Sequence, residues 1–390
     1  MAACNLSLLY NTLVIVVLMQ FQIFVVVSQP QVPCYFIFGD SLVDNGNNNR
    51  LVTMAKANYP PYGIDFPQGV TGRFTNGRTI ADFLVFHSKR TDQINNIDAN
   101  KFPNCTISGQ ELGFSRFIPS FATATNKDIS IGVNYGSGGA GIRDETGSNL
   151  VMPAREKLKH VAFFSSSKYH EKHAKLRIAN KKFSNKTFTN EYVKKCIYLV
   201  NMGSNDYINN YLMPEKFPTS RIYTPDQYAA VLAKQFSQQL TTLYKLGARK
   251  VAVNGVGLIG CAPAEIARFG TNGTCVDSIN NAVKLFNDRL KPIVDNINNN
   301  FSDARFTYIN ITSISTPQGG VALPNVPCCQ VRSDGQCIPN STPCTNRGFF
   351  IWFDGFHPTE VANTVLATRS YTAQSPNDAS PFDISQLAAL

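Results

Sequence analysis

Five short, mostly apolar runs constrain the fold of this 390-residue chain more than any other feature. Each is four or five residues long, which fits a buried parallel strand and is too short for an ordinary helix. The runs are Cys34–Phe38, Ile129–Val133, Cys196–Val200, Lys250–Val253 and Phe306–Ile309. Helical patterns lie between several of them, and this alternation predicts an α/β fold with a mostly parallel sheet.

The helical patterns carry their own start and stop signals. The clearest helix begins after Thr224, a predicted N-cap, with Pro225 at the first helical position and Gln227 completing a capping box. Apolar residues then recur at steps of three and four until Gly247 ends the pattern. Residues 280–297 show the same periodicity and predict a second helix.

Small and polar groups follow three of the predicted strands. They are Ser41, the glycine-rich turn Asn134–Gly139, and Asn205. Because the ligand crevice of a parallel sheet lies beyond the carboxyl ends of its strands, we expect all three at one edge. A serine hydroxyl, backbone N–H groups and an amide are groups that acyl transfer requires.

The choice of a base is narrow, because the chain has five histidines. Only His357 has a carboxylate, Asp354, at a spacing suited to orienting its ring. The other four are interpreted as surface or packing residues: His87, His160, His170 and His173. Taken singly, each segment is an ordinary turn, and Asp354 could equally cap a helix beside a surface histidine.

Two glycine patterns match the dinucleotide fingerprint, Gly136-x-Gly138-x-x-Gly141 and Gly255-x-Gly257-x-x-Gly260. That fingerprint also needs a helix that starts within the motif and an acidic residue at the end of the next strand. The first pattern is followed by a turn-like sequence and the second by a poor helix opening. We therefore exclude nicotinamide binding.

Together, the segments resemble the plant-type GDSL lipase/esterase family of the SGNH hydrolase superfamily. Residues 38–48, 134–142, 203–207 and 354–359 are similar to four blocks of that family, and residues 256–263 to a further segment. No Gly-x-Ser-x-Gly elbow occurs, which argues against an α/β-hydrolase. The resemblance implies a flavodoxin-like three-layer sandwich with a central, mostly parallel five-stranded sheet. It also implies a carboxylic-ester hydrolase that acts on a small-molecule or lipid ester and needs neither metal nor cofactor.

The resemblance also implies roles for three side chains. Ser41 would attack the acyl carbonyl, His357 would take its proton, and Asp354 would orient the imidazole. Two alternatives remain open at this stage: an acyltransferase that uses the same site, and an inactive extracellular binding protein.

The implied donors to the oxyanion come from three segments. They are the backbone N–H of Ser41, a backbone N–H at Gly138 or Gly139, and the side-chain amide of Asn205. The spacing from Asn134 favours Gly139.

The first 28 residues are expected to be a signal peptide that is removed. No charged side chain precedes Asp40, and the apolar run Leu13–Val27 is shorter than the roughly 20 residues of a membrane helix. Small residues stand at the −3 and −1 positions of a cleavage point before Gln29. We expect a single domain over residues 29–390 without an integral membrane segment; a retained anchor is the alternative.

Cysteines and sequons fit an exported chain. Four of the nine cysteines beyond the leader crowd into residues 328–344, which predicts a disulfide-pinned loop in place of a zinc site. The odd number predicts a free thiol or an intermolecular bond, and the pairing cannot be read from the sequence. The candidate glycosylation sites are Asn104, Asn185, Asn272, Asn300, Asn310 and Asn340. The expected location is extracellular, in the apoplast or cell wall.

The formal net charge of +10 is concentrated between Arg155 and Lys186. A solvated helical surface is the simpler interpretation, and attraction to an anionic cell-wall matrix is the alternative. Nucleic acid is not expected as a partner, because the chain is predicted to be exported and no aromatic-basic motif accompanies the charge.

Overall fold

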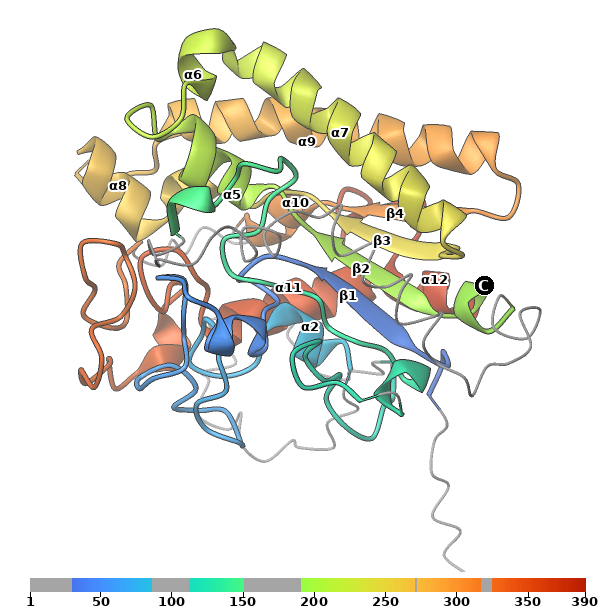
Figure 1. Ribbon diagram of the computed structural model, residues 1–390, viewed down its shortest axis with the longest axis horizontal. Helices are drawn as coiled ribbons and strands as arrows, with labels where there is room; N and C mark the ends of the chain where they lie inside the picture. The colour runs from blue at the N-terminus through green and yellow to red at the C-terminus, as the bar shows by residue number, and fades with distance from the viewer. Residues whose placement is uncertain (1–29, 86–111, 126, 151–190, 271, 317–324) are drawn as a thin grey trace, which may run out of the picture. The chain divides into compact units, whose positions relative to one another are not determined.

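The computed structural model describes residues 30–85, 112–125, 127–150, 191–270, 272–316 and 325–390. Gln31–Leu390 belong to one compact unit, whose described residues are shown as ribbons in Figure 1. No helix within these ranges is both long and apolar enough to cross a membrane.

A five-stranded sheet lies at the centre of this unit. Its strands pair in chain order, the first four parallel and the last antiparallel. They are β1 (Tyr35–Gly39), β2 (Ile197–Asn201), β3 (Lys250–Asn254), β4 (Arg305–Ile309) and β5 (Ala379–Ser380). The predicted α/β class and mostly parallel sheet are confirmed, and β1 to β4 agree with their predicted runs to within one residue at each end.

The predicted strand Ile129–Val133 is wrong. Asp128–Ser130 form a 3-10 turn, η2, because the Asp128 carboxylate accepts the N–H and the hydroxyl of Thr125, each at 2.7 Å. The chain runs beside β1 only after this turn and makes an isolated parallel bridge between Ile37 and Asn134. The fifth strand of the sheet is β5.

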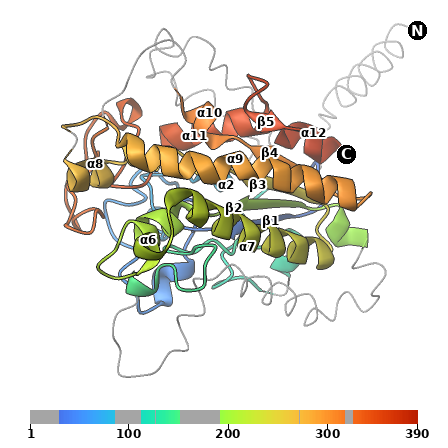
Figure 2. The same cartoon turned by 90° about the horizontal axis from the view of Figure 1, so that it is seen from above.

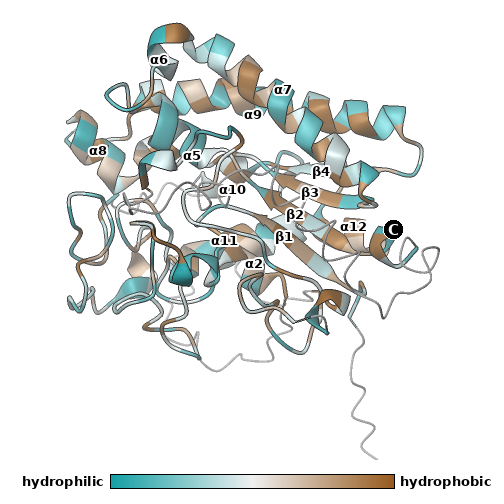
Figure 3. Ribbon diagram, in the orientation of Figure 1, coloured by the Kyte–Doolittle hydropathy of each residue, from teal (hydrophilic) through white to brown (hydrophobic). Residues whose placement is uncertain are grey.

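The parallel strands bury both faces, as their continuous apolar runs predict. In β1, Phe36 and Phe38 belong to one apolar core and Tyr35 and Ile37 to another on the opposite face. Figures 1 and 2 show α7 and α9 over one face and α2, α11 and α12 on the other, giving three layers. The strands are mostly brown in Figure 3, whereas α7 and α9 alternate between hydrophilic and hydrophobic residues.

Two long helices cover the first face. The predicted capping box of α7 is present, since Gln227 N–H reaches the Thr224 hydroxyl at 3.3 Å and the Gln227 side chain accepts Thr224 N–H at 2.9 Å. The second predicted helix is longer than residues 280–297. Among the described residues, the helices of six or more residues are α7 (Pro225–Lys245), α8 (Pro263–Phe269), α9 (Asp277–Asn300), α11 (Glu360–Tyr371) and α12 (Ile384–Ala389).

Within the part of the chain that the structure describes, shorter turns connect these elements. The α-helical ones are α2 (Ile80–Phe83), α5 (Ser204–Asp206), α6 (Thr219–Ile222) and α10 (Ile311–Ser315), and η6 (Tyr207–Tyr211) is a π-helical turn. The 3-10 turns besides η2 are η1 (Asn47–Arg50), η3 (Ser148–Leu150), η7 (Ile259–Cys261) and η8 (Arg347–Phe349).

Four disulfides link the described residues. They are Cys34–Cys196, Cys261–Cys275, Cys328–Cys344 and Cys329–Cys337. The last two confirm the predicted disulfide-pinned loop. The ninth cysteine beyond the leader, Cys105, lies outside the described residues.

Candidate active site

The carboxyl edge of the sheet collects the predicted polar groups. Ser41 follows β1 and Asn205 follows β2, while the glycine turn at Gly139 runs alongside β1. His357 reaches the same edge from the segment before α11. All four residues line one cavity of about 600 Å³.

A hydrogen-bonded chain connects Ser41, His357 and Asp354. His357 Nε2 lies 2.8 Å from Ser41 Oγ, and His357 Nδ1 lies 2.9 and 2.8 Å from the two carboxylate oxygens of Asp354. Asp354 is fully buried and His357 is 7% exposed. With Nδ1 protonated, Nε2 is left as an acceptor for the serine proton. The arrangement can therefore make the Ser41 hydroxyl a nucleophile.

The turn that carries His357 is built locally. Asp354 Oδ1 accepts the backbone N–H groups of Phe356 and His357, each at 2.8 Å. Thr359 then caps α11 by accepting the N–H of Ala362. Asp354 therefore both shapes this turn and contacts the imidazole. The alternative interpretation from the sequence is wrong on both points, because the N-cap of α11 is Thr359 and His357 is buried.

Three residues that line the cavity carry hydrogen-bond donors: Ser41, Gly139 and Asn205. Among the described residues, the backbone N–H groups of Ser41 and Gly139 have no hydrogen-bond acceptor. Gly138 differs, because its N–H already donates to Asp44 Oδ2 at 2.9 Å. Asn205 Nδ2 donates one hydrogen to the Ala140 carbonyl at 3.0 Å, which leaves its second hydrogen for a ligand.

The glycine turn is held by side chains that follow Ser41. Asn47 Nδ2 donates to the carbonyls of Asn134 and Gly136 at 2.9 and 2.6 Å. Asn48 Nδ2 donates to the Gly138 carbonyl at 2.9 Å. This stretch belongs to the family-like block at residues 38–48, whose asparagines carry no sequence signal for this role. Its asparagines are buried and fix the backbone on which Gly139 sits.

A second buried carboxylate, Asp206, ties the segment that follows the glycine turn to α5. It accepts the N–H groups of Ile142 and Arg143 at 2.7 and 3.0 Å and the Thr146 hydroxyl at 2.8 Å. Burial raises the pKa of Asp206 to about 6, although these three donors favour its ionised form. Asn209 orients the neighbouring amide by donating to Asn205 Oδ1 at 2.6 Å.

Asp40, the residue before Ser41, is a buried carboxyl group that is only partly hydrogen-bonded. Its Oδ1 accepts the N–H of Leu42 at 3.0 Å, and its Oδ2 has no hydrogen-bond partner among the described residues. Burial raises the pKa of Asp40 to about 7, despite the opposing effects of the Leu42 bond and of His357.

The wall of the cavity is mostly apolar away from these groups. One part is formed by α10 and α11, which contribute Ile311, Ile314, Val361 and Leu366. Val361 and Leu366 are only half-buried, whereas the polar Arg369 of α11 is buried and paired with Asp378 at 2.6 Å. Helix α11 therefore contributes both apolar and polar side chains to the cavity wall, since Asn363, Thr368 and Arg369 also line it.

Among the described residues, no cluster of three or more histidine, cysteine, aspartate and glutamate side chains is arranged to hold a metal ion. Three predicted glycosylation sites, Asn272, Asn300 and Asn340, are exposed, and Asn310 is half-buried at the start of α10. Several predicted features lie outside the described residues: Asn104, Asn185, His87, His160, His170, His173 and the basic stretch 155–186.

A serine hydroxyl bonded to an imidazole, itself bonded to a buried carboxylate, is an arrangement found in serine hydrolases. Comparison with known proteins gives the family. The model of the GDSL-like lipase/acylhydrolase family matches residues 35–369. Three GDSL esterases/lipases of Arabidopsis thaliana are 45%, 42% and 43% identical over 377, 372 and 376 residues, covering at least 93% of this chain and of each relative.

The chain therefore belongs to the GDSL-like lipase/acylhydrolase family, as the sequence resemblance indicated, and is a carboxylic-ester hydrolase.

Proposed function

We propose that this protein hydrolyses carboxylic esters through an acyl-enzyme formed on Ser41. The observation that carries the proposal is the unbroken hydrogen-bonded chain from Ser41 Oγ through His357 to Asp354, at the wall of a largely apolar cavity. Neither the base nor the nucleophile needs to move before reaction, because their atoms are already 2.8 Å apart.

In the first half-reaction, Ser41 Oγ forms a bond to the acyl carbon while His357 Nε2 takes the hydroxyl proton. The carbonyl oxygen becomes an oxyanion. His357 then gives its proton to the alcohol oxygen as the bond from the acyl carbon breaks. In the second half-reaction, the oxygen of a water molecule bonds to the acyl carbon while His357 Nε2 takes one of its protons. His357 then gives that proton to Ser41 Oγ as the bond between the acyl carbon and Oγ breaks, which releases the acid and regenerates the serine.

Three donors serve the oxyanion in this proposal: the N–H groups of Ser41 and Gly139 and the free hydrogen of the Asn205 amide. Gly139 is preferred to Gly138, since the Gly138 N–H is already bonded to Asp44 and Gly138 does not line the cavity. One such donor contributes about 100- to 1000-fold to the rate.

The cavity supports an ester with an apolar acyl chain as substrate. A chain that enters between α10 and α11 would contact Ile314, Val361 and Leu366, which line that part. Each buried methylene contributes about 0.8 kcal/mol to binding, so this wall would favour longer chains over acetate.

We further propose that residues 1–28 are removed and that the mature chain is secreted and glycosylated. Four disulfides support this, because such bonds persist in oxidising compartments. The exposure of Asn272, Asn300 and Asn340 is compatible with glycan attachment. Attraction to an anionic matrix depends on residues 155–186 and stays a prediction.

The test is a kinetic comparison of residues 29–390, expressed in a secretory host, with p-nitrophenyl butyrate as substrate. Ser41→Ala and His357→Ala should each reduce kcat by about 1000-fold or more while the thermal transition is retained. Ser237→Ala, on α7 and away from the cavity, is the matched control and should keep wild-type kinetics. A folded Ser41→Ala variant with most of its activity would contradict the proposal.

A further inference from the structure

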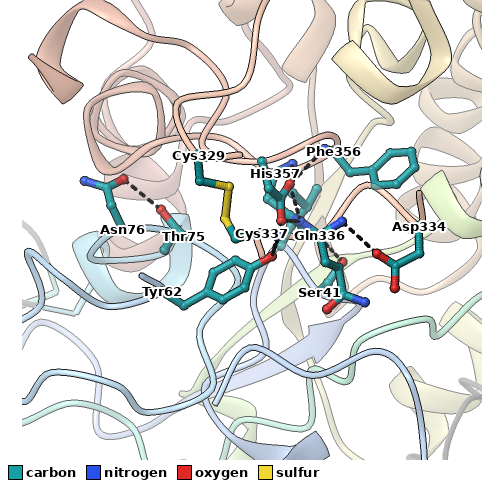
Figure 4. Close-up of polar contacts among 12 residues, drawn as sticks. Ser41, Tyr62, Thr75, Asn76, Cys329, Asp334, Gln336, Cys337, Phe356 and His357 are labelled. Carbon is teal, nitrogen blue, oxygen red and sulfur yellow. Dashed lines mark hydrogen bonds and ion pairs between the residues drawn. A yellow bond between two sulfur atoms is a disulfide. The ribbon is translucent and has the colours of Figure 1, made fainter. Parts of the chain in front are cut away.

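A buried tyrosine contacts the carboxylate of the proposed catalytic chain from outside its turn. Tyr62 lies 292 residues before Asp354, and its hydroxyl donates to Asp354 Oδ2 at 2.6 Å. The same hydroxyl oxygen accepts the backbone N–H of Cys337 at 3.1 Å. Figure 4 shows Tyr62 and Cys337 together, beside His357 and Ser41.

We propose that Tyr62 is a positioning residue for ester hydrolysis, and that the Cys337 N–H fixes its hydroxyl so that Asp354 stays aligned with His357 Nδ1. This inference rests on the proposed function, in which His357 is the base. Sequence reasoning missed it, because Tyr62 precedes a glycine in an ordinary turn-like segment and carries no spacing signal to Asp354.

The hydrogen bonds of Asp354 show why Tyr62 matters. Oδ1 is held by two N–H groups of its own turn, from Phe356 and His357. Oδ2 is contacted by the Tyr62 hydroxyl and by His357 Nδ1. Among the described residues, Tyr62 is thus the one donor that fixes the plane of the carboxylate independently of the turn and the imidazole.

The donor role of Tyr62 does not change with pH in the working range. Its side chain is fully buried, and burial, followed by the charge of Asp354, raises the pKa of Tyr62 well above its usual value. The phenol therefore keeps its proton and donates to the carboxylate. Hydrogen bonds to an ionised acceptor are the short, strong kind, which agrees with the 2.6 Å separation.

The support of Tyr62 is covalently reinforced. Cys337 is bonded to Cys329, whose N–H donates to the Phe353 carbonyl at 3.0 Å, directly before Asp354. The disulfide therefore joins Cys337, which holds Tyr62, to Cys329, which is hydrogen-bonded to the segment that carries Asp354. The ring of Tyr62 also packs edge-on against Phe353, with centroids 5.7 Å apart.

Tyr62→Phe tests the role, because it removes the hydroxyl and keeps the ring. Its neighbour Tyr59 supplies the matched control: Tyr59 packs against Tyr62, and its hydroxyl donates to the Cys337 carbonyl at 3.1 Å without contacting Asp354. We expect Tyr62→Phe to lower kcat for p-nitrophenyl butyrate about 10-fold or more, with KM unchanged because Tyr62 does not line the cavity of Ser41. Tyr59→Phe should change kcat less than twofold, because the Tyr59 hydroxyl does not donate to Asp354.

The pH profile separates positioning from general loss of structure. Without the phenol, Asp354 Oδ2 loses a donor, so the Asp354–His357 pair holds a proton more tightly. The acidic limb of the kcat/KM profile should move to higher pH in Tyr62→Phe and stay in place in Tyr59→Phe.

A double-mutant cycle completes the test. If Tyr62 acts through Asp354, adding Tyr62→Phe to Asp354→Ala should change the residual rate less than twofold. Equal losses in both backgrounds, or wild-type kinetics in Tyr62→Phe, would overturn the inference. Asp354→Ala alone reports on the proposed function, so failure of that proposal would be seen separately as retained activity in this single variant.

Discussion

Replacing Asp40 by asparagine should remove one large contribution to the pH dependence of this protein's stability. Asp40 is 1% exposed, and one of its carboxylate oxygens has no hydrogen-bond partner among the described residues. Asparagine resembles the protonated carboxyl group in shape, and its side-chain oxygen can still accept the Leu42 N–H. The substitution therefore removes a titratable group and keeps the hydrogen bond from the Leu42 N–H.

The magnitude follows from the raised pKa of Asp40, about 7 in the folded chain against 3.8 as the ordinary value. A carboxyl group whose pKa is raised on folding stabilises the fold fully below the unfolded value and loses that contribution as pH rises through the folded one. At about 1.4 kcal/mol for each pH unit, the contribution lost between pH 4 and pH 8 is about 4 kcal/mol. The nearby charge of His357 lowers this pKa and that of Asp206 raises it.

The measurement is urea unfolding of the wild type and Asp40→Asn, with disulfides intact, at intervals between pH 4 and pH 8. We expect the free energy of unfolding of Asp40→Asn, relative to wild type, to rise by about 4 kcal/mol over that range, because only the wild type loses stability at Asp40. A difference that is constant across the range would refute the argument that burial holds Asp40 in its protonated form.

Three further variants test other parts of the account. Asn205→Ala removes a proposed oxyanion donor and should lower kcat about 100- to 1000-fold in the p-nitrophenyl butyrate assay; a change under threefold would exclude that role. Leu366→Trp fills the cavity between α10 and α11, so the ratio of kcat/KM for laurate to that for acetate esters should fall at least about tenfold, and an unchanged ratio would place the acyl chain elsewhere. Replacing Cys34 and Cys196 by serine removes a disulfide between residues 162 positions apart and should reduce the free energy of unfolding, measured in urea, by about 2–5 kcal/mol. An unchanged free energy of unfolding would show that this disulfide does not stabilise the fold.

The sequence predicts the strands of the sheet well where burial on both faces requires mostly apolar residues. The strands β1 to β4 are buried on both faces, so their apolar runs are continuous and their ends are marked by polar residues. The exception, Ile129–Val133, has an apolar pattern, but the local bonds from Thr125 to the carboxylate of Asp128 turn the chain first. Apolar pattern alone cannot reveal this competition between side chain and backbone.

For the candidate site, the sequence predicts those residues for which both the chemical type and the position relative to a strand or a partner can be read from it. Ser41 and Asn205 follow strands, and His357 has its carboxylate three residues away, so parallel-sheet geometry and residue chemistry suffice. The hydrogen bond from Tyr62 to Asp354 and the pairing of Cys34 with Cys196 depend on loops and strands far apart in the chain. No local periodicity encodes such contacts.

The central claim is that His357 activates Ser41, and covalent labelling tests it most directly. Residues 29–390 would be treated with a fluorophosphonate, and the modified peptide would be located by mass spectrometry beside Ser41→Ala and His357→Ala. The account predicts one adduct per chain, on Ser41, with no labelling of Ser41→Ala and at least about 100-fold slower labelling of the folded His357→Ala. An unlabelled but folded wild type, or an adduct on another residue, would contradict it.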